Sequence, residues 1–235
     1  MNKTIKAGAL LVAGVFVLSG CGSSDGNSGS APAESSPTPT LAVGQDQYSP
    51  DELEDALVAL TEDQILTGDI ENDAMLRPQF ENDSFTGISI TPEQCSGLLS
   101  STFDKGIQDG NLAFGLLQDS NVLTLVSYED ASVLEEQVEG GDQVVAECAD
   151  LQMENDGVQL SAGVEKIDAS TDAPTTHAYR TTIDRGDAEG IAIHVMGISG
   201  TVQISVTMFD SADEAAGIAE AEEAINAVYA ELEKK

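Results

Sequence analysis

The chain contains no tryptophan, and only 4% of its 235 residues are aromatic. Its core must therefore be built from Val, Ile, Leu and Ala. Basic residues are scarce too, because 9 Lys and Arg stand against 42 Asp and Glu, giving a formal net charge of −33. A surface this acidic repels nucleic acid and anionic lipid, so both are excluded as partners of the folded domain. Solubility explains such a charge most simply, and binding of a cation or a basic ligand is the alternative.

Signals for catalysis are also sparse. The sequence has no His-Glu-x-x-His motif, which excludes the zincin class. The acidic stretch of residues 68–90 lacks the glycine and the final glutamate of an EF-hand loop. With 42 acids, close carboxylate pairs arise by chance and indicate no glycosidase. We therefore predict no enzymatic activity, no metal site and no cofactor.

The first 20 residues have the layout of a bacterial lipoprotein signal. Two lysines precede an apolar run from Ala7 to Leu18, which is too short to span a membrane as a helix. Small residues then lead to Cys21, which we expect to be lipidated and to become the mature N-terminus. An ordinary cleavable signal, in which Cys21 is incidental, is the alternative. The expected location is the outer face of the cytoplasmic membrane, through a lipid anchor such as palmitate at Cys21.

Three segments follow from this interpretation. Residues 1–20 are the signal, and residues 21–45 are the lipidated cysteine and a tether rich in Ser, Gly and Pro, which we expect to be disordered. Residues 46–235 form a single extracellular domain. Of the three cysteines, Cys95 and Cys148 remain for this domain, and a disulfide is the default in an oxidising compartment. A free, reactive thiol pair is the alternative.

The hydrophobic pattern predicts an α+β domain in which an antiparallel sheet has one face covered by helices. Ser49-Pro50-Asp51-Glu52 is a helix start with a capping box, and Thr91-Pro92-Glu93-Gln94 repeats that signature ahead of Leu98, Leu99 and Phe103. A further helix should begin at Asp130, break at Gly140-Gly141 and end near Asp150. A long C-terminal helix is expected after Asp210 or Ser211. Strands are expected at 112–117, 122–128, 158–164, 176–184, 191–196 and 202–208.

One set of polar residues on these strands is a candidate ligand site. His194 alternates with apolar neighbours, so it points away from the face that carries Ile193 and Val195. Adjacent strands should place Gln203, Ser205 and Arg180 on the same face as His194, where they could line a polar cleft. An Arg can bind a carboxylate or phosphate bidentately, although Arg180 can equally pair with a nearby acid. An ordinary solvated sheet face is the alternative.

The order of these features resembles exported actinobacterial lipoproteins related to the PknH-like extracellular sensor domain. The resemblance rests on Ser49 to Leu53, on Cys95, on Val122 to Tyr128 and on Cys148. It implies an antiparallel sheet with helices, a cleft proposed to bind a ligand, and no enzymatic activity. This chain departs from that family in having cysteines for one disulfide rather than two, and in lacking the family's tryptophans. The PsbP-like αβα type is a second resemblance, on fold grounds.

The function predicted from the sequence is a membrane-anchored, non-enzymatic binding or sensor-type module of the cell envelope. Its partner would be an unidentified envelope ligand or protein, and its oligomeric state is not indicated. A hydrolase acting on the envelope and a carrier or assembly lipoprotein for an apolar envelope molecule are the alternatives. A hydrolase would need a convergent nucleophile, base and acid, and a carrier would need a large apolar cavity.

Overall fold

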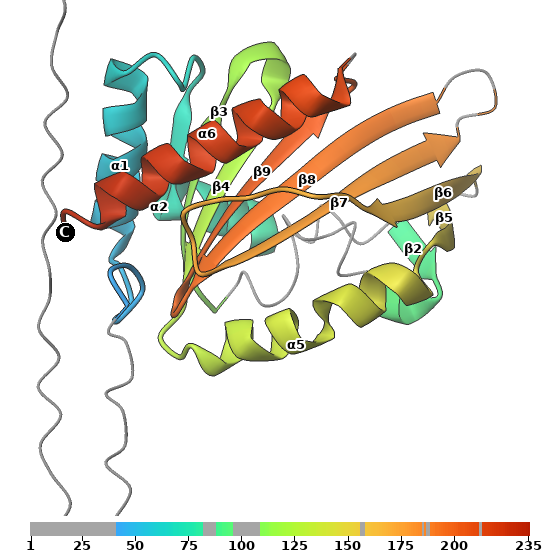
Figure 1. Cartoon of the computed structure of the whole chain (residues 1–235), viewed down its shortest axis with the longest axis horizontal. Coiled ribbons are helices and arrows are strands. Elements are labelled where there is room, and N and C mark those ends of the chain that lie inside the picture. The colour runs from blue at the N-terminus through green and yellow to red at the C-terminus, as the bar shows by residue number, and fades with distance from the viewer. Residues whose placement is uncertain are drawn as a thin grey trace, which may run out of the picture. The chain divides into compact units, whose positions relative to one another are not determined.

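A computed structural model describes residues 41–81, 88–95, 109–155, 158–184, 186, 189–211 and 213–235. In this part of the chain, nine strands form one antiparallel sheet in the order β1-β3-β4-β9-β8-β7-β6-β5-β2 (Figure 1). The strands are β1 (Ile70–Asn72), β2 (Ile88–Thr91), β3 (Asn111–Leu116), β4 (Val122–Ser127), β5 (Asp150–Asn155), β6 (Val158–Lys166), β7 (Thr175–Asp184), β8 (Glu189–Ser199) and β9 (Val202–Phe209). The period-two segments predicted from the sequence are confirmed as β3, β4 and β6 to β9.

Helices α1 (Pro50–Glu62) and α6 (Glu214–Leu232) pack against one face of the sheet. Figure 1 shows α6 crossing β8 and β9. The core beneath these helices contains almost only aliphatic side chains, as the lack of aromatic residues predicts. Its fully buried members include Leu53, Leu57, Leu60, Leu123, Leu125, Ile193, Val195, Val202, Ile204, Val206, Ile225 and Val228.

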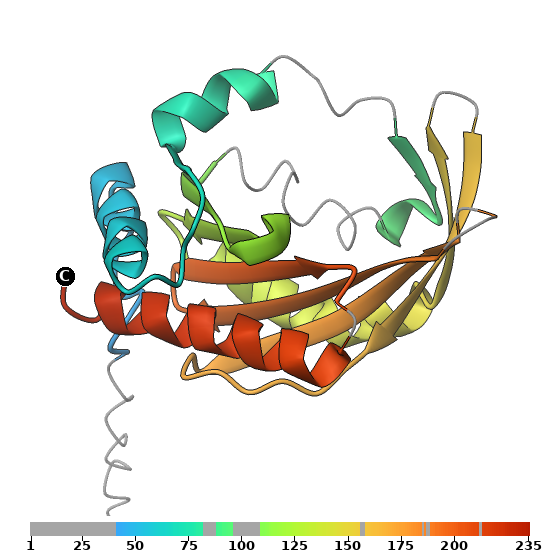
Figure 2. The ribbon, with the colours of Figure 1, turned by 90° about the horizontal axis from the view of Figure 1, so that it is seen from above.

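The opposite face carries helix α5 (Ser132–Glu147), helix α2 (Asp73–Glu81) and the 3-10 turn η1 (Glu93–Cys95) (Figure 2). Leu134 of α5 packs with Val126 and Ile198, whose side chains alternate with those of the α6 face. Helices therefore contact both faces of the sheet. The expectation of a single covered face was wrong, because the pattern of β8 and β9 is apolar on one side and only partly polar on the other.

The segment 41–48 anchors the start of the domain to the turn between β8 and β9. The Thr201 N–H donates to the Gly44 carbonyl at 2.9 Å, and the Ser199 hydroxyl donates to the Val43 carbonyl at 2.6 Å. Gly44 and Gly200 have φ values of +79° and +53°. A Cβ on Gly44 would lie 1.9 Å from the backbone carbonyl oxygen of Ser199, so this contact requires glycine.

Local sequence signals located the start of α1 correctly. Ser49 caps α1 with Glu52 in a capping box and Pro50 at the first position, as predicted. The predicted break at Gly140-Gly141 was wrong, because α5 is continuous. A Cβ on Gly141 would lie 3.3 Å from the His177 ring, so this glycine lets the helix lie close to β7.

Three other expectations need correction. Asp213, rather than Asp210 or Ser211, caps α6 through the Ala216 N–H. Glu93–Cys95 form the 3-10 turn η1, so the described residues after Pro92 do not begin an α-helix. Strands β1, β2 and β5 were not predicted; β1 and β2 are short, and β5 has only two apolar residues, Leu151 and Met153. The predictions for Leu98, Leu99, Phe103, the signal, Cys21 and the tether to residue 40 lie outside the described residues.

No helix of the described residues is long and apolar enough to cross a membrane.

Candidate ligand-binding site

Six polar side chains share the α5 face of the sheet near its middle. Cross-strand register pairs His194 with Thr207, and it pairs Thr124 with Ser205. The set, called the polar strip below, consists of Thr124 on β4, Thr181 on β7, His194 on β8, and Gln203, Ser205 and Thr207 on β9. The period-two alternation places aliphatic side chains on the face under α1 and α6, and it places the residues of the polar strip on the opposite face. The predicted grouping of His194, Gln203 and Ser205 on one face is therefore confirmed.

His194 is held by two neighbours within the strip. Its Nδ1 lies 3.1 Å from the Thr207 hydroxyl oxygen, and its ring stacks on Tyr179 with a centroid distance of 4.6 Å and an interplanar angle of 21°. Burial lowers the pKa of His194 from 6.5 to about 4, because desolvation disfavours the charged imidazolium. The ring is therefore neutral at pH 7, with one nitrogen able to donate and the other able to accept a hydrogen bond.

Gln203 and Thr181 have polar atoms without a protein partner. Gln203 is only 4% exposed; its amide Nε2 donates to the Ser205 hydroxyl at 2.8 Å, while its Oε1 accepts no hydrogen bond. Thr181 is 1% exposed, and its hydroxyl is unpaired as well. Because the large majority of buried polar side-chain atoms in native proteins are hydrogen-bonded, each of these atoms calls for an explanation.

Arg180 does not join the strip. It pairs with Ile193 across β7 and β8, which places it on the face of α6, opposite His194. There its guanidinium binds Glu214 at 2.8 Å and also pairs with Glu165. The hydrogen bond to Glu214 is the main cause that raises the pKa of Arg180. The expected placement beside His194 was wrong because residues 180 and 194 occupy alternating positions in the register, which the sequence alone does not fix.

Three strip residues were missed in the sequence. Thr124, Thr181 and Thr207 are 7%, 1% and 7% exposed, respectively. Threonine is favoured in strands for its branched Cβ, so its occurrence in a strand carries no functional signal by itself. The alternation of Thr207 and Ser205 with Val206 and Met208 was visible, and it is the signal that could have included Thr207.

The polar strip offers hydrogen bonds but no formal charge. Thr207 and His194 lie within the distance of a nucleophile and its base. A general base works best with a pKa near the operating pH, however, and the lowered pKa of His194 makes it a weak base at pH 7. Within the described residues, no group of three or more His, Cys, Asp or Glu side chains could hold a metal ion. This arrangement is suited to binding rather than to proton transfer.

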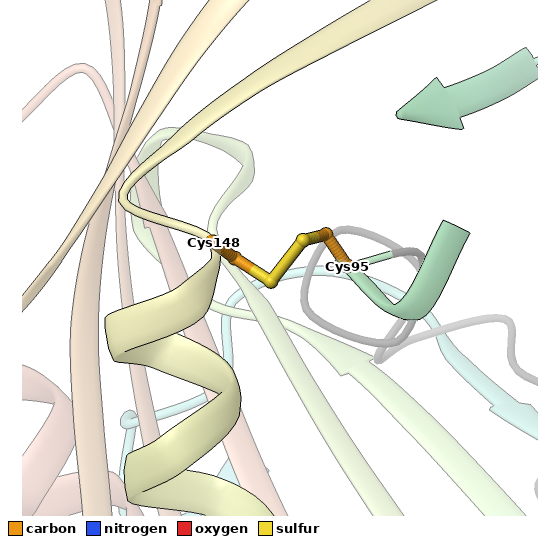
Figure 3. Close-up of a disulfide and its surroundings, with 2 residues drawn as sticks. All are labelled: Cys95 and Cys148. Carbon is orange, nitrogen blue, oxygen red and sulfur yellow. A yellow bond between two sulfur atoms is a disulfide. The ribbon is translucent and has the colours of Figure 1, made fainter. Parts of the chain in front are cut away.

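A disulfide between Cys95 and Cys148 fixes the end of α5 to η1, as the sequence predicted (Figure 3). The two cysteines are fully buried and pack with Leu151, Tyr179 and Met196. Tyr179 is the residue on which His194 stacks, so the disulfide belongs to the packing that supports one end of the polar strip. It joins the end of α5 to a 3-10 turn.

No protein-family model matches this sequence, and none of the curated proteins matches it. Among solved structures, the extracellular domain of PknH from Mycobacterium tuberculosis is similar, with a TM-score of 0.47 and 12% identity over 63% of this chain and 78% of that chain. A putative uncharacterized protein from Mycobacterium smegmatis is similar with a TM-score of 0.44 and 15% identity, covering 80% of this chain and 98% of that chain. The predicted resemblance to the PknH-like extracellular sensor domain is confirmed at this low level of identity.

Proposed function

We propose that this chain is an exported, lipid-anchored binding domain of the cell envelope, of the sensor type and without catalytic activity, that holds an uncharged, hydrogen-bonding ligand on the polar strip. The observation that carries this proposal is the buried, unpaired Oε1 of Gln203, on the strip that also contains the neutral His194. An unsatisfied buried acceptor costs about 1–3 kcal/mol, and a donor from a ligand would remove that cost.

The composition of the strip supports an uncharged ligand. Its members are an amide, four hydroxyls and an imidazole that is neutral at pH 7. Arg180, the cation expected to bind an anion, lies on the other face and is engaged by two glutamates. A polyhydroxylated molecule such as an oligosaccharide matches this set, because each of its hydroxyls both donates and accepts.

The proposed location rests on two features. Disulfides persist in oxidising compartments outside the cytoplasm, which supports export of a domain joined by Cys95 and Cys148. The lipoprotein signal ending at Cys21 supports attachment to the outer face of the cytoplasmic membrane. Together they describe a domain presented to molecules of the envelope rather than to those of the cytoplasm.

The test uses maltotriose and chitotriose as neutral probes, with glucose 6-phosphate as a charged comparison. Backbone amide shifts of the complete chain carrying Cys21→Ser, which prevents lipidation, report where each probe binds. We expect a neutral probe to shift the amides of Gln203, Ser205 and His194 at about 10 mM, the range of a weak site. Maltotriose and chitotriose should both be recovered uncleaved after prolonged incubation with the protein.

The matched variants are Gln203→Leu and Gln159→Leu, the second at an exposed position on β6. Gln203→Leu should abolish the shifts while leaving the free energy of unfolding unchanged or raised, because it removes an unpaired buried acceptor. Gln159→Leu should leave the shifts intact. Unaltered strip amides with both neutral probes, or cleavage of a probe, would contradict the proposal.

A further inference from the structure

A second concave site lies where the start of α5 meets the ends of β7 and β8. The cavity measures about 330 Å³, within the size range of small-molecule sites. We call it the tether-side pocket, because Leu41, at the start of the domain, forms part of its wall. Its apolar lining consists of Leu41, Ala131, Leu134, Val138, Pro174 and Ile198.

Two carboxylates belong to the same lining. Glu135 and Glu139 stand one helical turn apart on α5, and both are exposed residues. Residues four apart lie on one side of a helix, so both carboxylates border the same opening as Val138. The other polar lining residues are uncharged, and none of the lining residues is basic. The pocket therefore combines an apolar interior with a doubly negative rim.

We propose that the tether-side pocket binds a small organic cation, with an apolar body against Val138 and Pro174 and a protonated amine between Glu135 and Glu139. Apolar area removed from water supplies the main attraction, and the carboxylates select the charge. The formal charge of −33 adds a long-range attraction for cations over the whole surface. An apolar anion of the same size is repelled by the two carboxylates and by the net negative charge of the chain.

This pocket is chemically distinct from the polar strip. Ile198 pairs with Gln203 across β8 and β9, so the two sites are neighbours on one face, yet they share no residue. The strip presents uncharged hydrogen-bonding groups that are buried or partly buried, whereas the pocket presents aliphatic groups and two carboxylates. Loss of one site by mutation should leave the other intact, which separates this proposal from the proposed function.

The experiment compares three probes of equal chain length: hexylammonium, hexanol and hexanoate. Amide shifts of Leu134, Val138 and Ile198 are followed in the complete chain carrying Cys21→Ser at low salt. We expect hexylammonium to bind with a dissociation constant in the millimolar range, about 3- to 10-fold more tightly than hexanol, because exposed ion pairs each add a modest attraction. Hexanoate should bind most weakly, and added NaCl should reduce the difference in affinity between hexylammonium and hexanol.

Two double variants of α5 carry equal changes of charge. Glu135→Gln with Glu139→Gln should abolish the preference for hexylammonium over hexanol while keeping the binding of hexanol. Glu136→Gln with Glu147→Gln, at exposed positions outside the lining, should keep that preference. Ala131→Leu should fill the pocket and weaken all three probes. Equal binding of hexylammonium and hexanol, an equal loss of preference in both double variants, or unshifted pocket amides at about 10 mM would overturn the proposal.

Discussion

Lowering the pH from 7 to 4.5 should destabilise the domain through His194. Burial holds the pKa of this ring at about 4, whereas the unfolded chain titrates near 6.5. Between these values the unfolded state binds more protons, so stability falls as pH falls. The contribution of His194 to the free energy of unfolding is fully present above about pH 6.5 and is lost below about pH 4.

The magnitude follows from linkage. One pKa unit corresponds to about 1.4 kcal/mol, so the full loss below pH 4 is about 3 kcal/mol, and the loss between pH 7 and 4.5 is about 2 kcal/mol. Partial exposure of the ring makes these figures upper values. Carboxylates also titrate in this window, so the wild-type curve alone does not isolate His194.

The assay is urea unfolding at pH 7 and pH 4.5 for the wild type and for His194→Gln, which keeps a polar side chain that cannot titrate. The wild type should lose about 2 kcal/mol more than the variant over this interval. A direct check is the NMR titration of the imidazole, assigned by comparison with the variant because the chain has two histidines. Parallel losses in the two proteins, or a measured pKa of His194 near 6.5, would refute the reasoning.

Three further perturbations test other parts of the structure. Gly44→Ala should destabilise the domain by about 2 kcal/mol or more, since the new Cβ would overlap the Ser199 carbonyl oxygen. Gly140→Ala should stabilise the domain by about 0.5–1 kcal/mol, since nothing lies within 4 Å of the position of its Cβ. Both changes are measured as shifts of the urea unfolding midpoint. Replacing Cys95 and Cys148 together by Ala should cost about 2–4 kcal/mol by the same assay, and an unchanged midpoint would contradict it. Cys21→Ala should move the protein from the membrane to the soluble fraction on cell fractionation, and unchanged partitioning would count against the lipid anchor.

Much of this fold was predictable because period and capping are local properties. The alternation from Val202 to Met208 and the capping box at Ser49 depend only on neighbouring residues, and both are confirmed. The side of the sheet taken by Arg180 was not predictable, since it depends on register between strands. The continuity of α5 through Gly140 and Gly141 was also hidden, because the low helix propensity of glycine predicts a break, whereas the close approach of Gly141 to His177 arises only in the folded domain.

The candidate site likewise has features that the sequence predicts and features that arise only in the folded domain. His194, Gln203 and Ser205 were recognisable as polar residues on apolar strands, but their burial depends on what packs above them. The unpaired Oε1 of Gln203 is a property of the assembled sheet and has no counterpart in the sequence. The tether-side pocket joins Leu41 to α5, which lies some 90 positions later, and no local pattern indicates such a contact.

The attachment of segment 41–48 to the turn between β8 and β9 has a mechanical consequence. A pull on the preceding residues enters the domain at Val43 and Gly44, whose carbonyls bind Ser199 and Thr201. Strands β8 and β9 lie in the middle of the sheet, flanked by paired strands on both sides. Force is therefore distributed over several ladders of hydrogen bonds at once, instead of unzipping an edge strand bond by bond. A pull at this end would therefore load central strands of the sheet rather than an edge strand.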